Sequence, residues 1–417
     1  MSFRLSRAAT SLVALSFAVA AYGCAAPPAE SFEQGEDAIV DVQHTDVERQ
    51  SIGNCWLYAH ATWIESMHLS ATAEKFDVSQ SYWTYWHWFD QIAGSSWTTS
   101  ISTGGNWDTA NNIVKRYGLM PEADFVFADT TNEMSSRQKT ALDAMNESLK
   151  SGALSTAEAR RDRKIVRAEL DRAWGLTDAT KTMLDGVFGE DVSKTFASRS
   201  GAADASGTPI LRAADFKVAY PSSPGAQASE HTLTDAMREW RQTYYSTRSG
   251  RATIQRVQRA LHDAQPVIIT WFVDFNALEN RAGDLRGSFN KSTLDELGPG
   301  RQGGHMTVLE DYEATLESGE LLKAGVTLDK SDPEQGAKLE QALAAGTSIK
   351  FLRVKNSWGA ARPDRAFSPG MPGYHDLYMD YLNGPVKRCA QRDGETDTSN
   401  CTSETTPLQN FVLPPGY

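Results

Sequence analysis

Residues that favour helices and residues that favour strands are segregated along this chain, and their order strongly constrains the fold. Residues 131–199 are rich in Ala, Arg, Glu, Leu and Lys, contain few β-branched residues and no proline, and therefore predict a set of helices. Residues 265–273 predict a buried strand, and strand-like runs follow at 306–312, 349–354 and 373–382. A run of helices followed by a run of strands is typical of an α+β fold.

Two more helices are predicted nearer the N-terminus. Between Cys55 and Ala71 the apolar residues recur at spacings of three and four, which gives a helix one buried face. Gly53-Asn54 before this helix supplies a turn and a preferred N-cap. Residues 79–92 predict a second helix with many aromatic side chains, a density more typical of core packing than of a ligand site.

Composition excludes several classes of protein. The 417 residues are 40% hydrophobic and 23% charged, fractions that allow a sizeable core and exclude a disordered, collagenous or coiled-coil chain. Acidic residues outnumber basic ones, 53 to 41, and the sequence has no long Lys/Arg run. Nucleic acid is therefore not expected as a partner.

The first 23 residues read as a secretory signal. Arg4 and Arg7 precede an apolar run at 12–21 that is too short to span a bilayer of about 30 Å. The segment ending in Cys24 resembles a degenerate bacterial lipobox, so we expect export and a lipid anchor at Cys24, with the anchor as the protein's contact with a membrane. The alternative is ordinary cleavage near Ala26. Residues 24–45, rich in Ala, Pro and Glu, are expected to form a tether.

The chain has four cysteines, of which Cys389 and Cys401 lie twelve residues apart in a polar region. An exported protein meets an oxidising compartment, so a disulfide between these two is expected. The alternative is a pair of free thiols.

Cys55 is predicted at the first turn of its helix, where free N–H groups and the helix dipole stabilise a thiolate. A catalytic cysteine also needs an imidazole to carry its proton and a third group to orient that imidazole. His305 is the candidate imidazole because it follows two glycines and opens a strand. Asn356, at the end of another strand, is the candidate orienting group, and Trp358 would shield the Asn–His hydrogen bond from water.

The oxyanion that develops when a thiolate attacks a carbonyl also needs hydrogen-bond donors. The backbone N–H of Cys55 and the side chain of Gln50 would provide two. Taken singly, these residues have ordinary explanations, since a cysteine before a tryptophan is usually part of a core. Together, in the order Cys, His, Asn, they indicate nucleophilic catalysis. The other histidines are too scattered to suggest a metal site.

Three segments resemble the active-site motifs of papain-like cysteine peptidases, family C1. They are Gln50-Ser51-Ile52-Gly53-Asn54-Cys55-Trp56-Leu57-Tyr58-Ala59, Gly304-His305 and Asn356-Ser357-Trp358-Gly359. Segments 76–82 and 104–121, and the helical insertion after Phe125, resemble the bleomycin hydrolase/aminopeptidase C branch of that family. The resemblance covers roughly residues 45–383.

The resemblance implies a two-domain papain-like form of the α+β fold. A helical left domain would carry Cys55, and a β-barrel-like right domain would carry His305 and Asn356. A helical subdomain would be inserted at about 131–240, and a second insertion would lie on a hairpin at about 313–347.

This peptidase domain would span residues 46–383 and be followed by a C-terminal tail at 384–417. In the resembling branch, a terminal arm enters the cleft and holds the free amine of the substrate. Residues 411–417 are the counterpart by position, and a tail that is docked on the surface or disordered is the alternative.

By position, the resemblance implies Cys55 as nucleophile, His305 as general acid and base, Asn356 as orienting residue and Gln50 as oxyanion donor. Gln50 is five residues before Cys55, whereas the family usually has six. Trp358, Gly104 and Gly105 would line the substrate cleft, where the two glycines let a peptide backbone approach. The resemblance implies no metal and no organic cofactor.

The expected function is hydrolysis of peptide or protein substrates through a Cys55 acyl-thioester, either internally or as an aminopeptidase. Two alternatives stay open: a catalytically impaired, surface-anchored binding protein on the same scaffold, and an acyl transferase that uses the same intermediate. The helical insertion could mediate assembly into an oligomer, as it does in the resembling branch.

Overall fold

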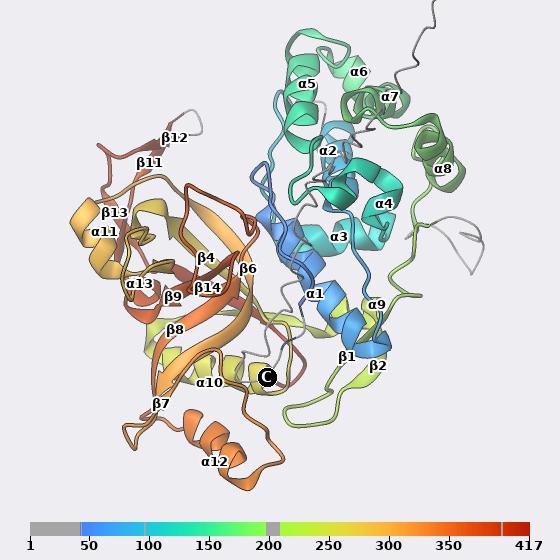
Figure 1. Ribbon diagram of the computed structural model, residues 1–417. Helices are drawn as coiled ribbons and strands as arrows, with labels where there is room; N and C mark the ends of the chain where they lie inside the picture. Colours follow the sequence, from blue (N-terminus) through green and yellow to red (C-terminus); the bar gives the residue numbers. More distant parts are fainter. Residues whose placement is uncertain (1–41, 43, 96, 197–208, 393–394) are drawn as a thin grey trace, which may run out of the picture. The chain divides into compact units, whose positions relative to one another are not determined.

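The structure is a computed structural model that describes residues 42, 44–95, 97–196, 209–392 and 395–417. The predicted signal segment, Cys24 and most of the predicted tether lie outside these residues. Helices occupy much of the first half of the described chain and strands much of the second (Figure 1). This confirms the α+β class.

The helices come mainly from the first half of the chain. Their bounds are α1 Cys55–Thr72, α2 Gln80–Gly94, α3 Trp107–Tyr117, α4 Glu122–Phe125, α5 Gln138–Ser151, α6 Ala157–Arg161, α7 Arg163–Trp174, α8 Asp178–Phe188, α9 Leu233–Glu239, α10 Gly250–His262, α11 Lys291–Leu297, α12 Pro333–Ala342 and α13 Met379–Asn383. Short 3₁₀ helices lie at Phe127–Thr131, Thr247–Ser249 and Phe275–Ala277.

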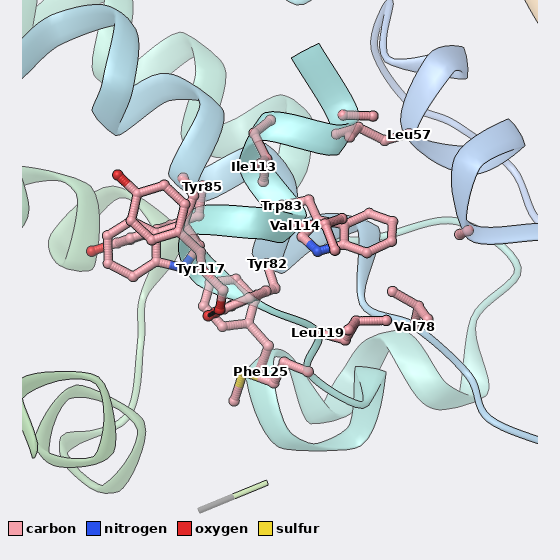
Figure 2. Close-up of a cluster of buried hydrophobic side chains, with 14 of the residues drawn as sticks. Leu57, Val78, Tyr82, Trp83, Tyr85, Ile113, Val114, Tyr117, Leu119 and Phe125 are labelled. Carbon is pink, nitrogen blue, oxygen red and sulfur yellow. Dashed lines mark hydrogen bonds between the residues drawn. The ribbon is translucent and has the colours of Figure 1, made fainter. Parts of the chain in front are cut away.

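The aromatic residues of α2 form the core of the helical part, as the sequence indicates. The Trp86 ring stacks on Tyr117 of α3 with centroids 4.2 Å apart, and the Tyr82 hydroxyl donates to the Tyr117 carbonyl over 2.7 Å. Figure 2 shows the Tyr82 and Tyr117 side chains among Trp83, Tyr85 and the aliphatic side chains around them. Ser79 caps α2 by accepting a hydrogen bond from the Tyr82 N–H, so the predicted start of this helix is confirmed.

The expected helical insertion at 131–240 is only partly helical. Helices α5 to α8 fill its first part, but β1 (Lys217–Tyr220) and β2 (Ser229–Thr232) form an antiparallel hairpin in its last part. Strand β1 packs against α1. Residues 217–220 contain two β-branched or aromatic side chains that the Ala- and Arg-rich pattern of the preceding segment obscured.

The main sheet lies in the second half of the chain. Its strands follow one path in the order β3 (Arg241–Tyr244), β14 (Leu408–Leu413), β4 (Ile268–Asp274), β6 (Gln302–Thr315), β8 (Ser348–Lys355), β9 (Tyr374–Tyr378) and β5 (Ser288–Phe289), with β7 (Leu321–Leu322) paired to β6. The pairs along this path are antiparallel except β5 with β9.

Strands β6 and β8 are antiparallel neighbours joined by residues 316–347. This connection carries β7 and the helix α12, whose N-cap Asp332 accepts hydrogen bonds from the N–H groups of Glu334 and Gln335. The predicted strand at 373–382 ends early, because residues 379–383 form α13.

The predicted separate tail at 384–417 is wrong. Residues 408–413 form β14, which lies between β3 and β4 inside the main sheet. Phe411 is fully buried there. Tyr417 packs on α10, where its carbonyl oxygen accepts from Arg256 and its hydroxyl donates to Asp263. The sequence analysis missed this six-residue strand because it follows a long polar segment.

Those polar residues form small two-stranded sheets. Strand β10 (Val386–Arg388) pairs with β13 (Ser403–Thr405), and β11 (Ala390–Arg392) pairs with β12 (Glu395–Asp397). The expected disulfide joins Cys389 to Cys401 beside them.

The end of the predicted tether is also part of the fold. Val42 is buried in the core of the sheet, and His44 Nε2 lies 2.5 Å from a carboxylate oxygen of Glu310 on β6. The Thr45 hydroxyl donates to Glu65 of α1 over 2.6 Å. The folded part therefore begins by residue 42. None of the helices in the described part of the chain has the length and apolar character that crossing a bilayer demands.

Truncating Phe411 tests whether the C-terminal segment is integral to the sheet. Phe411→Ala removes a fully buried ring and is expected to lower the free energy of unfolding by about 3–5 kcal/mol, measured by urea denaturation. Tyr244→Ala on the neighbouring strand β3 removes a side chain that is 76% exposed and is expected to change it by less than about 0.5 kcal/mol. Equal, small effects of the two variants would contradict this placement.

Candidate active site

Cys55 is the first residue of α1 and is 8% exposed. Asn54 occupies the N-cap position, but its side chain does not cap the helix. Instead, its amide donates to Thr84 and to Gln138, each over 3.1 Å. The Leu57 N–H donates to the Asn54 carbonyl over 3.0 Å, which leaves the N–H groups of Cys55 and Trp56 for another acceptor. The backbones of Met306, Trp56 and Cys55 itself all interact with the Cys55 sulfur and favour its thiolate.

Burial has a larger effect on the pKa of the Cys55 thiol than these backbone groups have. It raises the pKa of the Cys55 thiol to about 11, so the thiol keeps its proton at neutral pH. The sequence analysis expected the helix start to stabilise a thiolate. Desolvation of the sulfur has the larger effect and favours the neutral thiol.

His305 lies on β6 opposite Trp271 of β4 and is 5% exposed. Its Nε2 lies 2.8 Å from Oδ1 of Asn356, which follows the last residue of β8. The Trp358 ring stacks on the imidazole with centroids 4.7 Å apart and an interplanar angle of 20°. The structure thus brings His305, Asn356 and Trp358 together as predicted, and Trp358 covers the Asn–His pair.

The hydrogen bond to Asn356 selects one form of the imidazole. Because Oδ1 can only accept, Nε2 of His305 carries the proton and Nδ1 is free to accept another. Burial lowers the pKa of His305 to about 4, against the opposing effect of this hydrogen bond, so the ring is neutral. The Met306 backbone is hydrogen-bonded to the Cys55 thiol, so this sulfur lies beside the strand that carries His305.

His375 is a residue of the site that the sequence analysis missed. It is fully buried on β9, and its Nδ1 lies 3.3 Å from Nδ2 of Asn356. Burial lowers its pKa to about 3, so the ring is neutral. Because Nδ2 of Asn356 can only donate, Nδ1 of His375 accepts and its Nε2 carries the proton. This contact fixes which end of the amide faces His305. A histidine in an apolar strand that pairs with the strand before Asn356 is the signal that could have found it.

Gln50 is held between the loop before α1 and the segment after Asn356. Its backbone N–H donates to the Ser357 carbonyl over 3.0 Å, and its Oε1 accepts from the Ser357 hydroxyl over 2.6 Å. Its amide nitrogen donates one hydrogen to the Ile52 carbonyl over 2.7 Å. Among the described residues the second amide hydrogen makes no hydrogen bond, so it is still available as a donor.

Gly104 and Gly105, both predicted to line the substrate cleft, have different surroundings. A Cβ on Gly104 would meet no clash and would lie at an ordinary contact distance of 3.8 Å from the Ser102 hydroxyl oxygen. The Gly104 carbonyl oxygen lies 3.2 Å from Nε2 of His87. A Cβ on Gly105 would instead overlap the ring of Trp56, which donates to the Thr103 carbonyl over 2.9 Å. Gly105 therefore serves the packing of its loop on the helix that carries Cys55, whereas Gly104 leaves room for a ligand.

Three carboxylates near the site form the group best suited to a cation in the described part of the chain. They are Glu48, Asp77 and Glu122, with ligand oxygens within 4.8 Å of one another. Burial raises the pKa of Glu122 to about 8, and nearby Asp77, Asp129 and Glu65 add to the effect. At neutral pH this cluster therefore holds protons, which explains how the acids coexist.

The chain shows limited similarity to known proteins. No protein-family model matches it. Aminopeptidase C of Lactobacillus delbrueckii subsp. lactis is 27% identical over 135 residues, which make up 28% of this chain and 29% of that protein. The match therefore covers less than a third of the relative's length.

Two solved structures cover most of the chain at low identity. PepW from Lactobacillus rhamnosis aligns with a TM-score of 0.40 and 11% identity, over 92% of this chain and 82% of its own. Xylellain, a cysteine protease from Xylella fastidiosa, aligns with a TM-score of 0.36 and 12% identity, over 91% of this chain and 86% of its own. What the site can do is therefore argued from its own geometry.

Replacing His375 tests its role in orienting Asn356. His375→Leu removes the acceptor and is expected to slow alkylation of Cys55 by iodoacetamide by about 10- to 100-fold, because the Asn356 amide no longer holds His305 in one tautomer. His375→Gln offers an acceptor again and is expected to restore most of the rate. Quantitative peptide mass spectrometry across pH 5–9 measures both.

His60→Leu is the matched control for His375. His60 is also fully buried, and its ring makes no hydrogen bond to any residue in the described part of the chain, so its replacement is expected to leave the alkylation rate unchanged. Equal rates for His375→Leu and His375→Gln would show that His375 acts through packing alone.

Glu122→Gln tests proton sharing in the acidic cluster. Since the folded state raises the pKa of Glu122 from 4.5 to about 8, its stabilising contribution is present below pH 4.5 and is lost as the pH rises towards 8. Gln cannot ionise, so the variant avoids the loss of stability that ionisation of Glu122 causes. Its free energy of unfolding is expected to exceed that of the parent by about 1–2 kcal/mol at pH 8, but not at pH 5. Urea denaturation at both pH values measures the difference, with the exposed Glu74→Gln as control.

Proposed function

We propose that the protein is a cysteine peptidase that cleaves peptide bonds through an acyl-thioester on Cys55. The observation that carries this proposal is the imidazole of His305, fixed by Asn356 and covered by Trp358, on the strand whose next residue contacts the Cys55 sulfur. The limited similarity to aminopeptidase C supports the same class of reaction.

The reaction begins from a neutral thiol and a neutral imidazole. Nδ1 of His305 takes the thiol proton as the sulfur attacks the substrate carbonyl, and the backbone N–H of Cys55 and the free amide hydrogen of Gln50 stabilise the oxyanion. His305 then gives its proton to the leaving amine as the C–N bond breaks. Water attacks the thioester with His305 as base, which releases the acid and restores the thiol.

Internal cleavage is favoured over removal of N-terminal residues. An arm that binds the substrate's free amine would have to lie in the cleft, but residues 408–413 pair with β3 and β4, and Tyr417 bonds to α10. The intact His305–Asn356 pair favours an enzyme over a binding protein. Acyl transfer differs from hydrolysis only in the acceptor of the same intermediate.

We place this activity outside the cytoplasm, on peptide or protein substrates. The Cys389–Cys401 disulfide supports export, because such bonds persist in oxidising compartments. A lipid on Cys24 would then hold the enzyme at a membrane.

Labelling with a peptidyl epoxide tests the proposed function. The reagent is expected to modify Cys55 in the parent, as read by mass spectrometry, and not in Cys55→Ala. Cys55→Ala is also expected to lower peptide hydrolysis by roughly 10³-fold or more. Product masses from a peptide with a blocked N-terminus report internal cleavage. A folded parent protein that is neither labelled nor active would contradict the proposal.

A further inference from the structure

Two arginine side chains lie against the rings of Trp358 and Phe275, which together form an aromatic wall beside His305. The Trp358 ring stacks on His305 on one side and lies 5.3 Å from the Phe275 ring on another. The guanidinium carbon of Arg365 is 4.2 Å from the Trp358 centroid and 4.7 Å from that of Phe275. The guanidinium carbon of Arg301 is 4.2 Å from the Phe275 centroid. Cation–π contact thus holds two positive charges close to the catalytic imidazole.

These charges lack matching carboxylates. The Arg365 guanidinium lies 3.9 Å from the carboxylate of Asp364, but Nε and Nη2 of Arg362 both donate to that same carboxylate. Within the residues that the structure describes, neither Arg301 nor Arg49 has a carboxylate within ion-pair distance.

Arg49 adds a third cation to this wall. Its backbone forms a bridge with Trp358, and its Nε is buried without a hydrogen-bond partner. The carbonyl of Glu133 accepts from the Arg49 backbone N–H, and Oε1 of its carboxylate accepts from the N–H groups of Ala360 and Ala361. A buried donor without an acceptor is costly, so this surface is suited to an anion that is supplied from outside.

The like charges are close enough to affect one another. Burial, together with the charges of Arg362, Arg301 and Arg49, lowers the pKa of Arg365 to about 10. This local excess of positive charge stands in a chain with a net charge of −12. Arg301 is exposed, so a ligand can reach the cluster from solvent.

We propose that Arg301, Arg365 and Arg49 form a subsite for an acidic side chain of the substrate, on the leaving-group side of the scissile bond. The inference rests on the proposed peptidase function and names its preferred substrate: peptides with Asp or Glu shortly after the cleavage point. We place the subsite on the leaving-group side because His305 must reach the leaving amine to protonate it. Trp358, whose ring contacts Arg365, lies against the His305 ring. Guanidinium groups bind carboxylates through charge-assisted hydrogen bonds.

A bound carboxylate would also act on the catalytic histidine. The charge of Arg365 opposes protonation of both His305 and His375. A substrate carboxylate beside Arg365 offsets that charge and favours the protonated His305 that the leaving amine requires. The subsite is therefore expected to raise kcat as well as to lower KM.

Matched peptides test the subsite. Three internally quenched peptides share one sequence on the acyl side and carry Glu, Gln or Lys at the first two positions after the scissile bond. The parent is expected to cleave the Glu peptide with a kcat/KM about tenfold above that of the Gln peptide, and the Lys peptide more slowly still.

Variants of the exposed Arg301 separate charge from packing. Arg301→Gln is expected to reduce the Glu/Gln ratio towards one, Arg301→Lys to keep most of it, and Arg301→Glu to favour the Lys peptide. Arg248→Gln, which replaces an exposed arginine on a 3₁₀ helix outside this cluster, is expected to keep the parent's ratio.

The outcomes distinguish the two proposals. Epoxide labelling of Cys55 with equal cleavage of the three peptides, or an Arg301→Glu variant with the parent's ratio, overturns the subsite and leaves the peptidase proposal standing. Failure of the parent to label and to cleave any of the peptides overturns the peptidase proposal and the subsite with it.

Discussion

The hydrogen bond between His305 and Asn356 depends on the register between strands β6 and β8, which are distant in the sequence. In the β6–β8 pair, Val308 lies opposite Lys355. The pairing of β6 with β8 ends there, and just beyond it the rings of His305 and Trp358 are stacked. Asn356 leaves the end of β8 at the point where its amide meets Nε2 of His305. A slip of one residue would turn these side chains to opposite faces, so the register that builds the sheet also builds the site.

The same end of β8 is tied to the helix that carries Cys55. Lys355 is buried, and its ammonium donates to the carbonyl and hydroxyl of Thr45 and to the hydroxyl of Thr62 on α1. The charge of Glu65, also on α1, opposes the effect of burial on the pKa of Lys355. A buried charge is tolerated where it is paired and hydrogen-bonded, and these contacts leave Lys355 few other positions. Lys355 therefore fixes Asn356, its neighbour, relative to the start of α1.

Short-range sequence signals predicted the parts of the site that depend on short-range structure. The spacing of apolar residues predicted the helix that begins at Cys55, and the apolar run after His305 predicted a strand. The expectation that His305 opens this strand is wrong, because β6 already begins at Gln302. Contacts between distant segments left weaker signals. The place of β14 in the sheet depends on pairing with strands more than 130 residues away, and His375 reaches Asn356 only because β9 pairs with β8. The raised pKa of the Cys55 thiol depends on burial, which no local pattern encodes.

Charge acts on this protein at two length scales. The net charge of −12 is felt by an approaching molecule within a screening length of about 8 Å at physiological salt, and at that range it disfavours acidic partners. The arginines beside Trp358 act at contact distance and in a partly desolvated setting, where each charge counts for more. Under the subsite proposal, the overall charge affects the rate of encounter and the arginine cluster affects which bound peptide is cleaved. Selectivity for acidic residues is therefore compatible with an acidic enzyme, because the two effects enter different steps.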